Sequence, residues 1–385
     1  MEKAAACDVA IIGAGISGAM TAHLLARAGL EVIVLDRREA AHGSTSGNTG
    51  LLLYETDQPM VRLERRLGRD AAQQAYCRCR AAVREIEKLA RRARIGCGFR
   101  WRENLYVAAQ RRHVGWLRRE YALREETGFD VEWWSRSRIA RETSLPHAAG
   151  ILSRGSAELD AYRLAYGLLL AAQDDGAAVH DRTEVTGWRF GRAGVELKTS
   201  RGPRVKARHL VVASGYESGR FLPRPYGQLH STFALVSEPL QAFPGWPREG
   251  CLIWDTGDPY LYLRVTEDGR AMIGGYDEPF RDPRERDRLL PAKAGALHRR
   301  FRQLFPRIPL EVATAWAGTF GITSDGLPYI GQHPEVPHTW FALGFGGNGT
   351  TFSLIAAEMV RAGILGERDP DAELFGFGRA ERAAP

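Results

Sequence analysis

The chain has 385 residues, 44% of them hydrophobic and 26% charged, which is typical of a globular protein of about two domains. No apolar run reaches the roughly 18 residues that a membrane-spanning helix needs, and too little precedes the first strand for a signal peptide. These features argue against a transmembrane helix and predict a cytoplasmic protein.

Cysteines and charge narrow the functional classes further. Five scattered cysteines lack metal-ligand or C-x-x-C spacing, so we expect reduced thiols and no metal site. The net charge of +7 invites a nucleic-acid hypothesis. The basic residues, however, are almost all arginine and are spread along the chain, which indicates a coding bias more than a binding patch.

Residues 8–36 are typical of a βαβ unit that binds a dinucleotide. An apolar strand leads into Gly13, Gly15 and Gly18 at G-x-G-x-x-G spacing. An Ala/Leu-rich helix follows, and a second apolar strand ends at Asp36. The glycines allow a tight turn, close approach of a pyrophosphate and close helix packing. The helix N-terminus offers N–H groups to phosphates, and Asp36 can accept hydrogen bonds from ribose hydroxyls.

The next segments mix polar loops with helices. Residues 42–59 are rich in Gly, Ser, Thr and Asn, which could wrap a pyrophosphate and the polyol beyond it; a surface loop is the alternative. Helical periodicity predicts helices over 60–94, with a break at Gly68, and over 110–127. A strand is expected near 103–109.

The second half begins with a helix and strands that end at Ser214 and Gly215, either beside the dinucleotide or in a simple tight turn. Residues 220–316 combine prolines, aromatics and alternating strands, which predicts an antiparallel sheet interrupted by a helix over 284–304. Residues 339–366 then give a strand, a glycine-rich turn and a helix whose N-terminus suits an electron-rich group.

Five stretches together resemble one family. They are GAGISG (13–18) with Asp36, GSTSGNTG (43–50), LVVASGYES (210–218), WAGTFGITSDGLPYIG (316–331) and GFGGNGTTFS (344–353). Their order and spacing are similar to those of the D-amino-acid oxidase superfamily of FAD-dependent oxidoreductases, whose members include glycine, sarcosine and γ-glutamylputrescine oxidases.

The resemblance implies an α/β fold with two domains. A discontinuous Rossmann-like FAD-binding domain would comprise residues 1–95, 151–219 and 317–385. An α+β substrate domain with an antiparallel sheet would comprise residues 96–150 and 220–316.

The resemblance also implies which residues hold FAD. The ADP half would lie on Gly13, Gly15, Ile16, Ser17, Gly18, Asp36 and Arg37, with Val185, Ser214 and Gly215 nearby. The pyrophosphate, ribityl chain and flavin would follow Ser44, Thr45, Asn48, Gly50, Leu51 and Leu52. The pyrimidine edge of the flavin would meet Gly346, Gly347, Asn348, Gly349 and Thr350.

Two departures from the family pattern refine the expectation. Many amino-acid oxidases of this superfamily carry an arginine for the substrate carboxylate where this chain has Phe320. An α-amino acid held by its carboxylate at that spot is therefore disfavoured. Relatives with covalent FAD use a cysteine or histidine where this chain has Gly318 and Gly47, so we expect non-covalent FAD.

Candidate substrate residues come from two segments and two large aromatics. Arg264 alternates with Tyr260 and Tyr262, so the three share one face of a strand. That face is either turned to the flavin, which would make Arg264 an anion anchor, or turned outward. Tyr54, Glu55 and Asp57 could approach the substrate, where an acid would favour a cationic amine, or could form a polar helix start. The set of predicted substrate residues is Tyr54, Tyr262, Arg264, Trp316 and Phe320.

The sequence therefore predicts an FAD-dependent oxidoreductase that takes a hydride from a carbon bearing an amino group and gives an imine that water hydrolyses. The donor would be an amine or amino acid, and the acceptor oxygen or an electron carrier. No catalytic base is assigned, because an amine that binds neutral needs none. The alternatives are oxidation of a 2-hydroxy acid, a nicotinamide dehydrogenase, and an RNA-associated flavin oxidoreductase that acts on an amine-bearing nucleoside.

Overall fold

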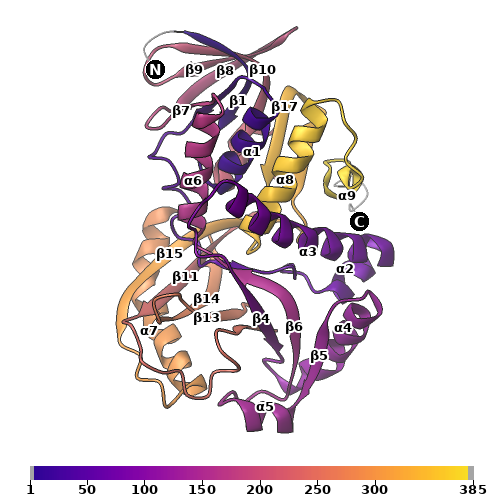
Figure 1. The fold of residues 1–385 in the computed structure, drawn as a ribbon, viewed down its shortest axis with the longest axis vertical. Coiled ribbons are helices and arrows are strands. Elements are labelled where there is room, and N and C mark those ends of the chain that lie inside the picture. Colours follow the sequence, from indigo (N-terminus) through magenta and orange to yellow (C-terminus); the bar gives the residue numbers. More distant parts are fainter. Residues whose placement is uncertain (1–3, 380–385) are drawn as a thin grey trace.

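The computed structural model describes residues 4–379, which form two β-sheets with helices packed around them (Figure 1). The first sheet has eight strands, five of which run parallel. Its order is β16 (Tyr329–His333), β17 (Val336–Leu343), β10 (Arg204–Val212), β1 (Ala5–Ile12), β2 (Val32–Leu35) and β7 (Ala178–His180), with β9 (Gly194–Thr199) and β8 (Val185–Gly191) continuing from β10.

The second sheet has nine strands and is mostly antiparallel, as predicted. Its order is β15 (Val312–Ile322), β11 (Gln228–Ser237), β14 (Ala271–Pro279), β13 (Leu261–Val265), β12 (Leu252–Asp255), β4 (Arg100–Val107), β6 (Ala149–Glu158) and β3 (Leu51–Leu52), with β5 (Val131–Ser135) beside β6. Strands β12 and β4 pair in parallel, with Leu252 opposite Asn104. This pair brings together two segments that are far apart in the sequence.

Strand β1 is central in the first sheet and is covered on both faces. Val9 and Ile11 pack into the core beneath the helices, whereas Ala10 and Ile12 pack into the core on the opposite face. A strand buried on both faces reads as a nearly continuous apolar run, which explains the sequence of its second half.

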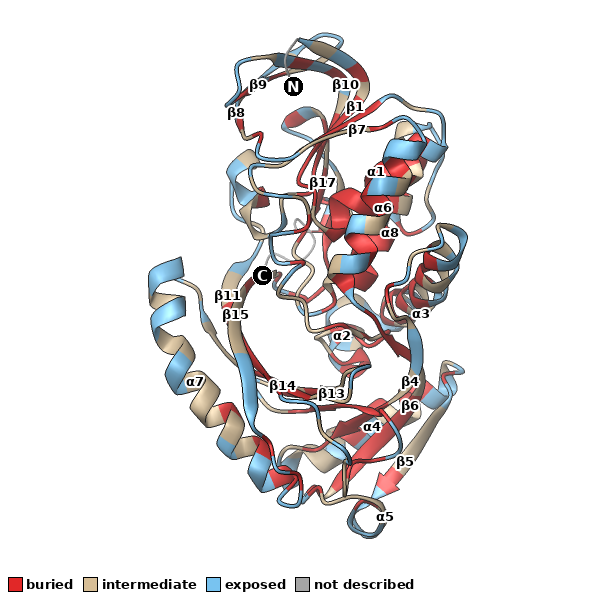
Figure 2. Cartoon of the chain, turned by 60° about the vertical axis from the view of Figure 1, so that its left-hand side comes forward, coloured by how far each residue is buried: buried red, intermediate tan, exposed pale blue. Residues whose placement is uncertain are grey.

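Three helices cover one face of the first sheet: α1 (Ile16–Arg27), α6 (Ala161–Asp174) and α8 (Gly349–Ile364) (Figures 1 and 2). Small residues let them approach closely. A Cβ built on Gly18 would lie 1.8 Å from the Gly13 carbonyl oxygen, so α1 can only start so near β1 because residue 18 is glycine.

The remaining helices lie outside this layer. They are α2 (Met60–Leu67), α3 (Arg69–Arg92), α4 (Val114–Glu126), α5 (Arg136–Glu142), α7 (Pro283–Leu304) and α9 (Ala372–Phe375), with short 3₁₀ turns η1 (Arg111–His113) and η2 (Gly215–Phe221). The predicted break at Gly68 is confirmed, because this glycine, with a φ of +88°, separates α2 from α3.

Helix α7 packs on the outer face of the second sheet and leaves the inner face to the first domain (Figure 2). Phe233 and Leu235 of β11 join Leu297 and Phe301 of α7 in one core. Because side chains alternate along a strand, the neighbouring Thr232 points to the opposite face of β11, where it lines the cavity described below.

The second sheet takes more of the chain than the predicted domain boundaries gave it. Strand β6 extends to Glu158, and strand β15 extends to Ile322. The predicted boundaries had placed residues 151–158 and 317–322 in the FAD-binding domain.

A buried ion network ties residues 55–61 to helix α4. Arg124 of α4 has no exposed surface; its Nε lies 2.7 Å from Glu120 Oε1 and its Nη1 3.0 Å from Glu55 Oε1. Glu120 also accepts the N–H groups of Met60 (3.1 Å) and Val61 (2.9 Å), the first residues of α2. The network therefore fixes the polypeptide on both sides of residues 55–61.

Replacing Arg124 by methionine is expected to lower the free energy of unfolding by about 3–5 kcal/mol, because it leaves two buried carboxylates without their cation. The matched control is Arg69→Met, since Arg69 pairs with Glu126 on the exposed surface and such pairs contribute about 0–1 kcal/mol. Denaturant unfolding measures both. Equal losses in the two variants would contradict the assignment.

Candidate active site

A cavity runs between the sheets, from the glycine turn after β1 to the inner face of the second sheet. Much of its lining comes from stretches within residues 43–57, 213–221, 318–321 and 342–349. All five stretches that carry the family resemblance thus contribute to one site.

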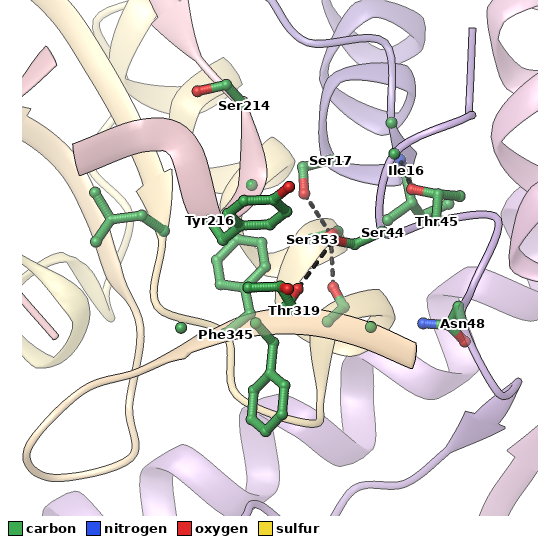
Figure 3. A pocket seen from close by; sticks show the side chains of 18 of the residues that line it. Ile16, Ser17, Ser44, Thr45, Asn48, Ser214, Tyr216, Thr319, Phe345 and Ser353 are labelled. Atoms are coloured by element: carbon green, nitrogen blue, oxygen red, sulfur yellow. Dashed lines mark hydrogen bonds between the residues drawn. The ribbon is translucent and has the colours of Figure 1, made fainter. Parts of the chain in front are cut away.

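Two helix N-termini converge on the middle of this cavity. The hydroxyl oxygens of Ser17, in α1, and Ser353, in α8, lie 2.7 Å apart (Figure 3). Neither Gly15, which precedes α1, nor Asn348, which precedes α8, caps its helix with a side chain. The positive ends of both helices are therefore available to anionic or electron-rich groups.

The loop 43–50 ties the first helix to the second sheet. Thr45 Oγ1 accepts the N–H of Ile16 at 3.0 Å, and Ser44 Oγ donates to the carbonyl oxygen of Thr319 at 3.1 Å (Figure 3). This loop contains the hydroxyl and amide side chains predicted to follow the pyrophosphate, and it lines the cavity.

Asp36 shapes the nucleotide end of the cavity. Its Oδ2 accepts the N–H of Ala14 at 2.7 Å and its Oδ1 the N–H of Arg38 at 2.8 Å. Glu217, from η2, pairs with both Arg37 and Arg38. Arg37 therefore faces the cavity with its charge already engaged.

Most of the predicted cofactor residues line the cavity. They are Gly13, Gly15, Ile16, Ser17, Asp36, Arg37, Ser44, Thr45, Asn48, Leu51, Val185, Ser214, Gly215, Gly346, Gly347, Asn348 and Gly349. The other four, Gly18, Gly50, Leu52 and Thr350, are outside the lining. A Cβ on Gly50 (φ +75°) would lie 2.3 Å from the Leu159 carbonyl oxygen, so this glycine lets two backbones pass.

Two of the predicted substrate residues, Tyr262 and Phe320, line the far end of the cavity. Trp316 is outside the lining, because its ring supports the loop from behind: its Nε1 donates to the Gly47 carbonyl oxygen at 2.9 Å. Trp254, which the sequence suggested as a wall residue, does line the cavity.

Tyr54 faces away from the cavity. Its neighbours Leu53 and Glu55 line the cavity, so the alternation of an extended chain turns Tyr54 to the other side. There it is fully buried and stacks on Phe129 with ring centroids 4.8 Å apart. The tyrosine is a packing residue in this structure.

Arg264 is also outside the cavity lining. Its Nη1 lies 3.3 Å from Glu158 Oε2, and Arg102 Nη2 lies 2.8 Å from the other oxygen of the same carboxylate. The predicted anion anchor is thus engaged by Glu158 from β6. Strand alternation could not reveal this partner, which is 106 residues away.

Several lining residues were absent from the sequence prediction. They are Thr49, Thr232, Arg220 and Phe221, together with Tyr216. Tyr216 lies within the resembling stretch 210–218, which could have drawn attention to it. Thr232 carries no local signal, because only the pairing of β11 with its neighbours brings it to the site.

Asp57 lies at the junction between helix α8 and the second sheet. Its Oδ2 accepts the N–H of Gly347 at 2.6 Å, and its Oδ1 lies 3.5 Å from the Tyr260 hydroxyl, which donates to it. Burial raises the pKa of Asp57 to about 6, against the opposing effect of these two hydrogen bonds. The carboxyl is therefore mostly ionised at pH 7 and above.

Asp277 of β14 is a second acid with a shifted pKa. The pKa of Asp277 is raised to about 7, mainly by burial and also by the charge of Asp57, while a hydrogen bond with Thr232 and the charge of Lys293 oppose the shift. Tyr262, whose pKa burial also raises, bonds Thr232 and Thr49. Asp57, Tyr260 and Tyr262 thus line the far end of the cavity, and Asp277 is outside the lining but close enough for the charge of Asp57 to raise its pKa.

The fold and the cavity define a dinucleotide-binding oxidoreductase. Residues 8–362 match the family described as FAD dependent oxidoreductase (DAO), and the chain belongs to that family. It is an FAD-dependent oxidoreductase, as the sequence predicted. The residues present fit FAD, because uncapped helix N-termini and glycine-lined backbone face the cavity at both its nucleotide end and its centre.

Known proteins match along nearly the whole chain. γ-Glutamylputrescine oxidoreductase of Escherichia coli K12 is 25% identical over 388 residues, which cover 97% of this chain and 86% of that protein. Glycine oxidase of Geobacillus kaustophilus is 27% identical over 377 residues, 92% of each. The crystal structure of glycine oxidase from that organism has a TM-score of 0.80 at 23% identity, covering 97% of this chain and 98% of that one. The predicted fold class is confirmed.

The described residues lack two features, a membrane-spanning helix and a cluster of metal ligands. Between residues 4 and 379, no helix is both long enough and apolar enough to cross a bilayer. In the same part of the chain, no group of three or more His, Cys, Asp or Glu side chains is arranged to hold a metal ion.

Gly13→Ala is expected to reduce the bound flavin severalfold. A Cβ at this position would lie 2.4 Å from the Ala213 carbonyl oxygen, so the backbone segments that follow the paired strands β1 and β10 must move apart. Gly29→Ala is the control, because Gly29 also has positive φ (+83°) but no atom within 4 Å of the added Cβ. The ratio of absorbance at 450 nm to that at 280 nm measures flavin content. Equal loss in both variants would contradict the steric explanation.

Asp57→Asn is expected to gain thermal stability relative to the unsubstituted protein as pH rises from about 4 to 7. The raised pKa means that ionisation of Asp57 costs folding free energy, and this cost is complete above pH 6. Asp268→Asn should show the opposite trend, because hydrogen bonds from Thr266 and Arg270 outweigh desolvation and lower the pKa of Asp268. Unfolding temperatures across this pH range measure both, and parallel curves would refute the assignment.

Proposed function

We propose that this FAD-dependent oxidoreductase oxidises an amine or amino acid at a carbon that bears nitrogen. The observation that carries the proposal is the likeness, over more than nine-tenths of this chain, to proteins named glycine oxidase and γ-glutamylputrescine oxidoreductase. Both names denote donors with an amino group. The acids and phenols at the far end of the cavity are consistent with such a donor.

In this proposal the residues of the chain bind FAD and orient the donor. FAD, when bound, supplies the acceptor for a hydride from the carbon next to nitrogen. Asp36, Thr45 and the N-terminus of α1 hold the nucleotide half, and the turn 346–349 meets the flavin. Tyr262 and Phe320 limit the space open to the donor and exclude water. The imine product is hydrolysed by water.

We further propose that FAD is bound without a covalent link. Gly47 and Gly318 line the cavity where covalent relatives are expected to carry histidine or cysteine, and glycine has no side chain to form a bond. Purified protein should be yellow, and acid precipitation should release all its flavin into the supernatant as FAD. A yellow pellet would contradict this proposal.

The donor and the acceptor are tested together. Amines, amino acids and 2-hydroxy acids are each mixed anaerobically with the holoenzyme, and loss of absorbance at 450 nm reports oxidation. Peroxide formation in air, compared with reduction of a dye, distinguishes oxygen from an electron carrier as acceptor. Oxidation of 2-hydroxy acids alone would overturn the amine proposal. Salt-sensitive RNA retention on filters would instead support the nucleoside alternative.

A further inference from the structure

Charge is divided unequally along the cavity. Among the described residues that line it, the arginines and lysines are Arg37, Arg38 and Arg220, all with the lining of the nucleotide end. The charged residues that line the far end are Glu55 and Asp57. Glu55 is already paired with Arg124, which it shares with Glu120. The far end is therefore electronegative where relatives that bind a carboxylate would need a cation.

Asp57 has no cationic partner in the described part of the chain. Its carboxylate is held by the Gly347 N–H and the Tyr260 hydroxyl. These donors fix its position and leave its charge in place, and the N-terminus of α8 favours the ionised form. An ionised, positioned carboxylate on a cavity wall is a suitable partner for an ammonium group.

Asp277 brings a second carboxyl group near the first. An irregular pairing between β11 and β14 and positive φ values at Gly275 (+129°) and Tyr276 (+56°) interrupt the strand just before it. Its Oδ1 is buried and has no hydrogen-bond partner among the described residues. Lys293, the nearby cation, bonds instead to the Tyr276 carbonyl oxygen (2.8 Å) and to Glu278 (2.6 Å).

Aromatic rings complete this end of the cavity. Trp254 stacks on Tyr106 with centroids 3.8 Å apart and meets Tyr260 edge to face at 6.5 Å. Trp254 is only 5% exposed, and its Nε1 has no hydrogen-bond partner in the described structure. Aromatic faces next to carboxylates favour a cationic group and disfavour an anionic one.

We propose, on the basis of the proposed function, that Asp57 forms a cation subsite whose negative charge Asp277 reinforces, and that the substrate is a positively charged amine without a carboxylate on the oxidised carbon. Burial removes hydration from both carboxyl groups, and the charge of Asp57 opposes the ionisation of Asp277, so their ionisation is costly in the free protein. A bound ammonium group relieves both effects. Asp57 is then the residue that determines specificity, and Asp277 reinforces its charge.

Binding of three isosteric probes to the holoenzyme tests the subsite. Choline, 3,3-dimethyl-1-butanol and 3,3-dimethylbutanoate have similar shapes but are cationic, neutral and anionic, respectively. Titration calorimetry at pH 8 should show choline binding at least 10-fold more tightly than the alcohol, and the anion more weakly still. Asp57→Asn keeps an acceptor for the Gly347 N–H and should reduce the preference for choline to less than about 3-fold, because a neutral amide no longer attracts the cation through its charge.

Two further variants separate charge from folding. Asp277→Asn should reduce the same preference by a smaller factor. Asp268→Asn removes an exposed carboxylate from the turn between β13 and β14 and should leave the preference for choline unchanged. Flavin absorbance confirms that each variant retains FAD. Equal affinity for choline and its neutral isostere, or tighter binding of the anion, would overturn the proposal.

A pair of substrates distinguishes this proposal from the broader one. Butylamine and norvaline differ only by the carboxylate on the oxidised carbon. We expect kcat/KM to be at least 10-fold higher for butylamine than for norvaline. Asp57→Asn should lower kcat/KM for butylamine at least 10-fold relative to the unsubstituted protein. Preference for norvaline would overturn the cation subsite and leave amine oxidation standing, whereas failure to oxidise any amine or amino acid would remove the proposed function itself.

Discussion

The geometry of the cavity depends on the buried ion network of Glu55, Arg124 and Glu120. Residues 53–58 lead from β3 of the second sheet towards helix α2, and they contain no helix or strand that could hold them by backbone ladders. The network supplies what regular structure does not. It binds this segment to α4 through Arg124 and to the start of α2 through the carboxylate of Glu120.

The same segment also contacts the turn that precedes helix α8. Asn348 Nδ2 donates to the Glu55 carbonyl oxygen at 2.6 Å, and Gly347 donates to Asp57 two residues later. Burying charges is costly, and an apolar core of the same volume is often as stable. What the network adds is position: Glu55 cannot shift without unpairing a buried cation, so Asp57 and the turn before α8 stay in register.

The parts of this structure that the sequence predicted are those that depend on local chemistry. The turn at Gly13, the helix start at Ile16 and the acid at Asp36 lie within 29 residues of one another, and each has one physical role. Tyr54 and Arg264 were harder, because a strand pattern shows which residues share a face but not which partner waits on that face. Phe129 and Glu158 decide their positions, and both belong to distant segments. Thr232 reaches the cavity only through sheet pairing.

The far end of the cavity illustrates how function and stability compete in one place. Asp57 and Asp277 ionise less readily than free aspartates because burial withholds water from both, and the charge of Asp57 further opposes the ionisation of Asp277. Asparagine at position 57 could still accept the Gly347 N–H without that cost. A carboxylate whose charge destabilises the free protein, in a cavity end lined by aromatic rings, makes physical sense where a cation completes the site. The nucleotide end shows the reverse balance, since Arg37 and Arg38 pair with Glu217, Arg220 pairs with Glu184, and its remaining donors are helix N–H groups. The cavity is thus polarised from end to end, with anion-binding chemistry at the nucleotide and cation-binding chemistry beyond it.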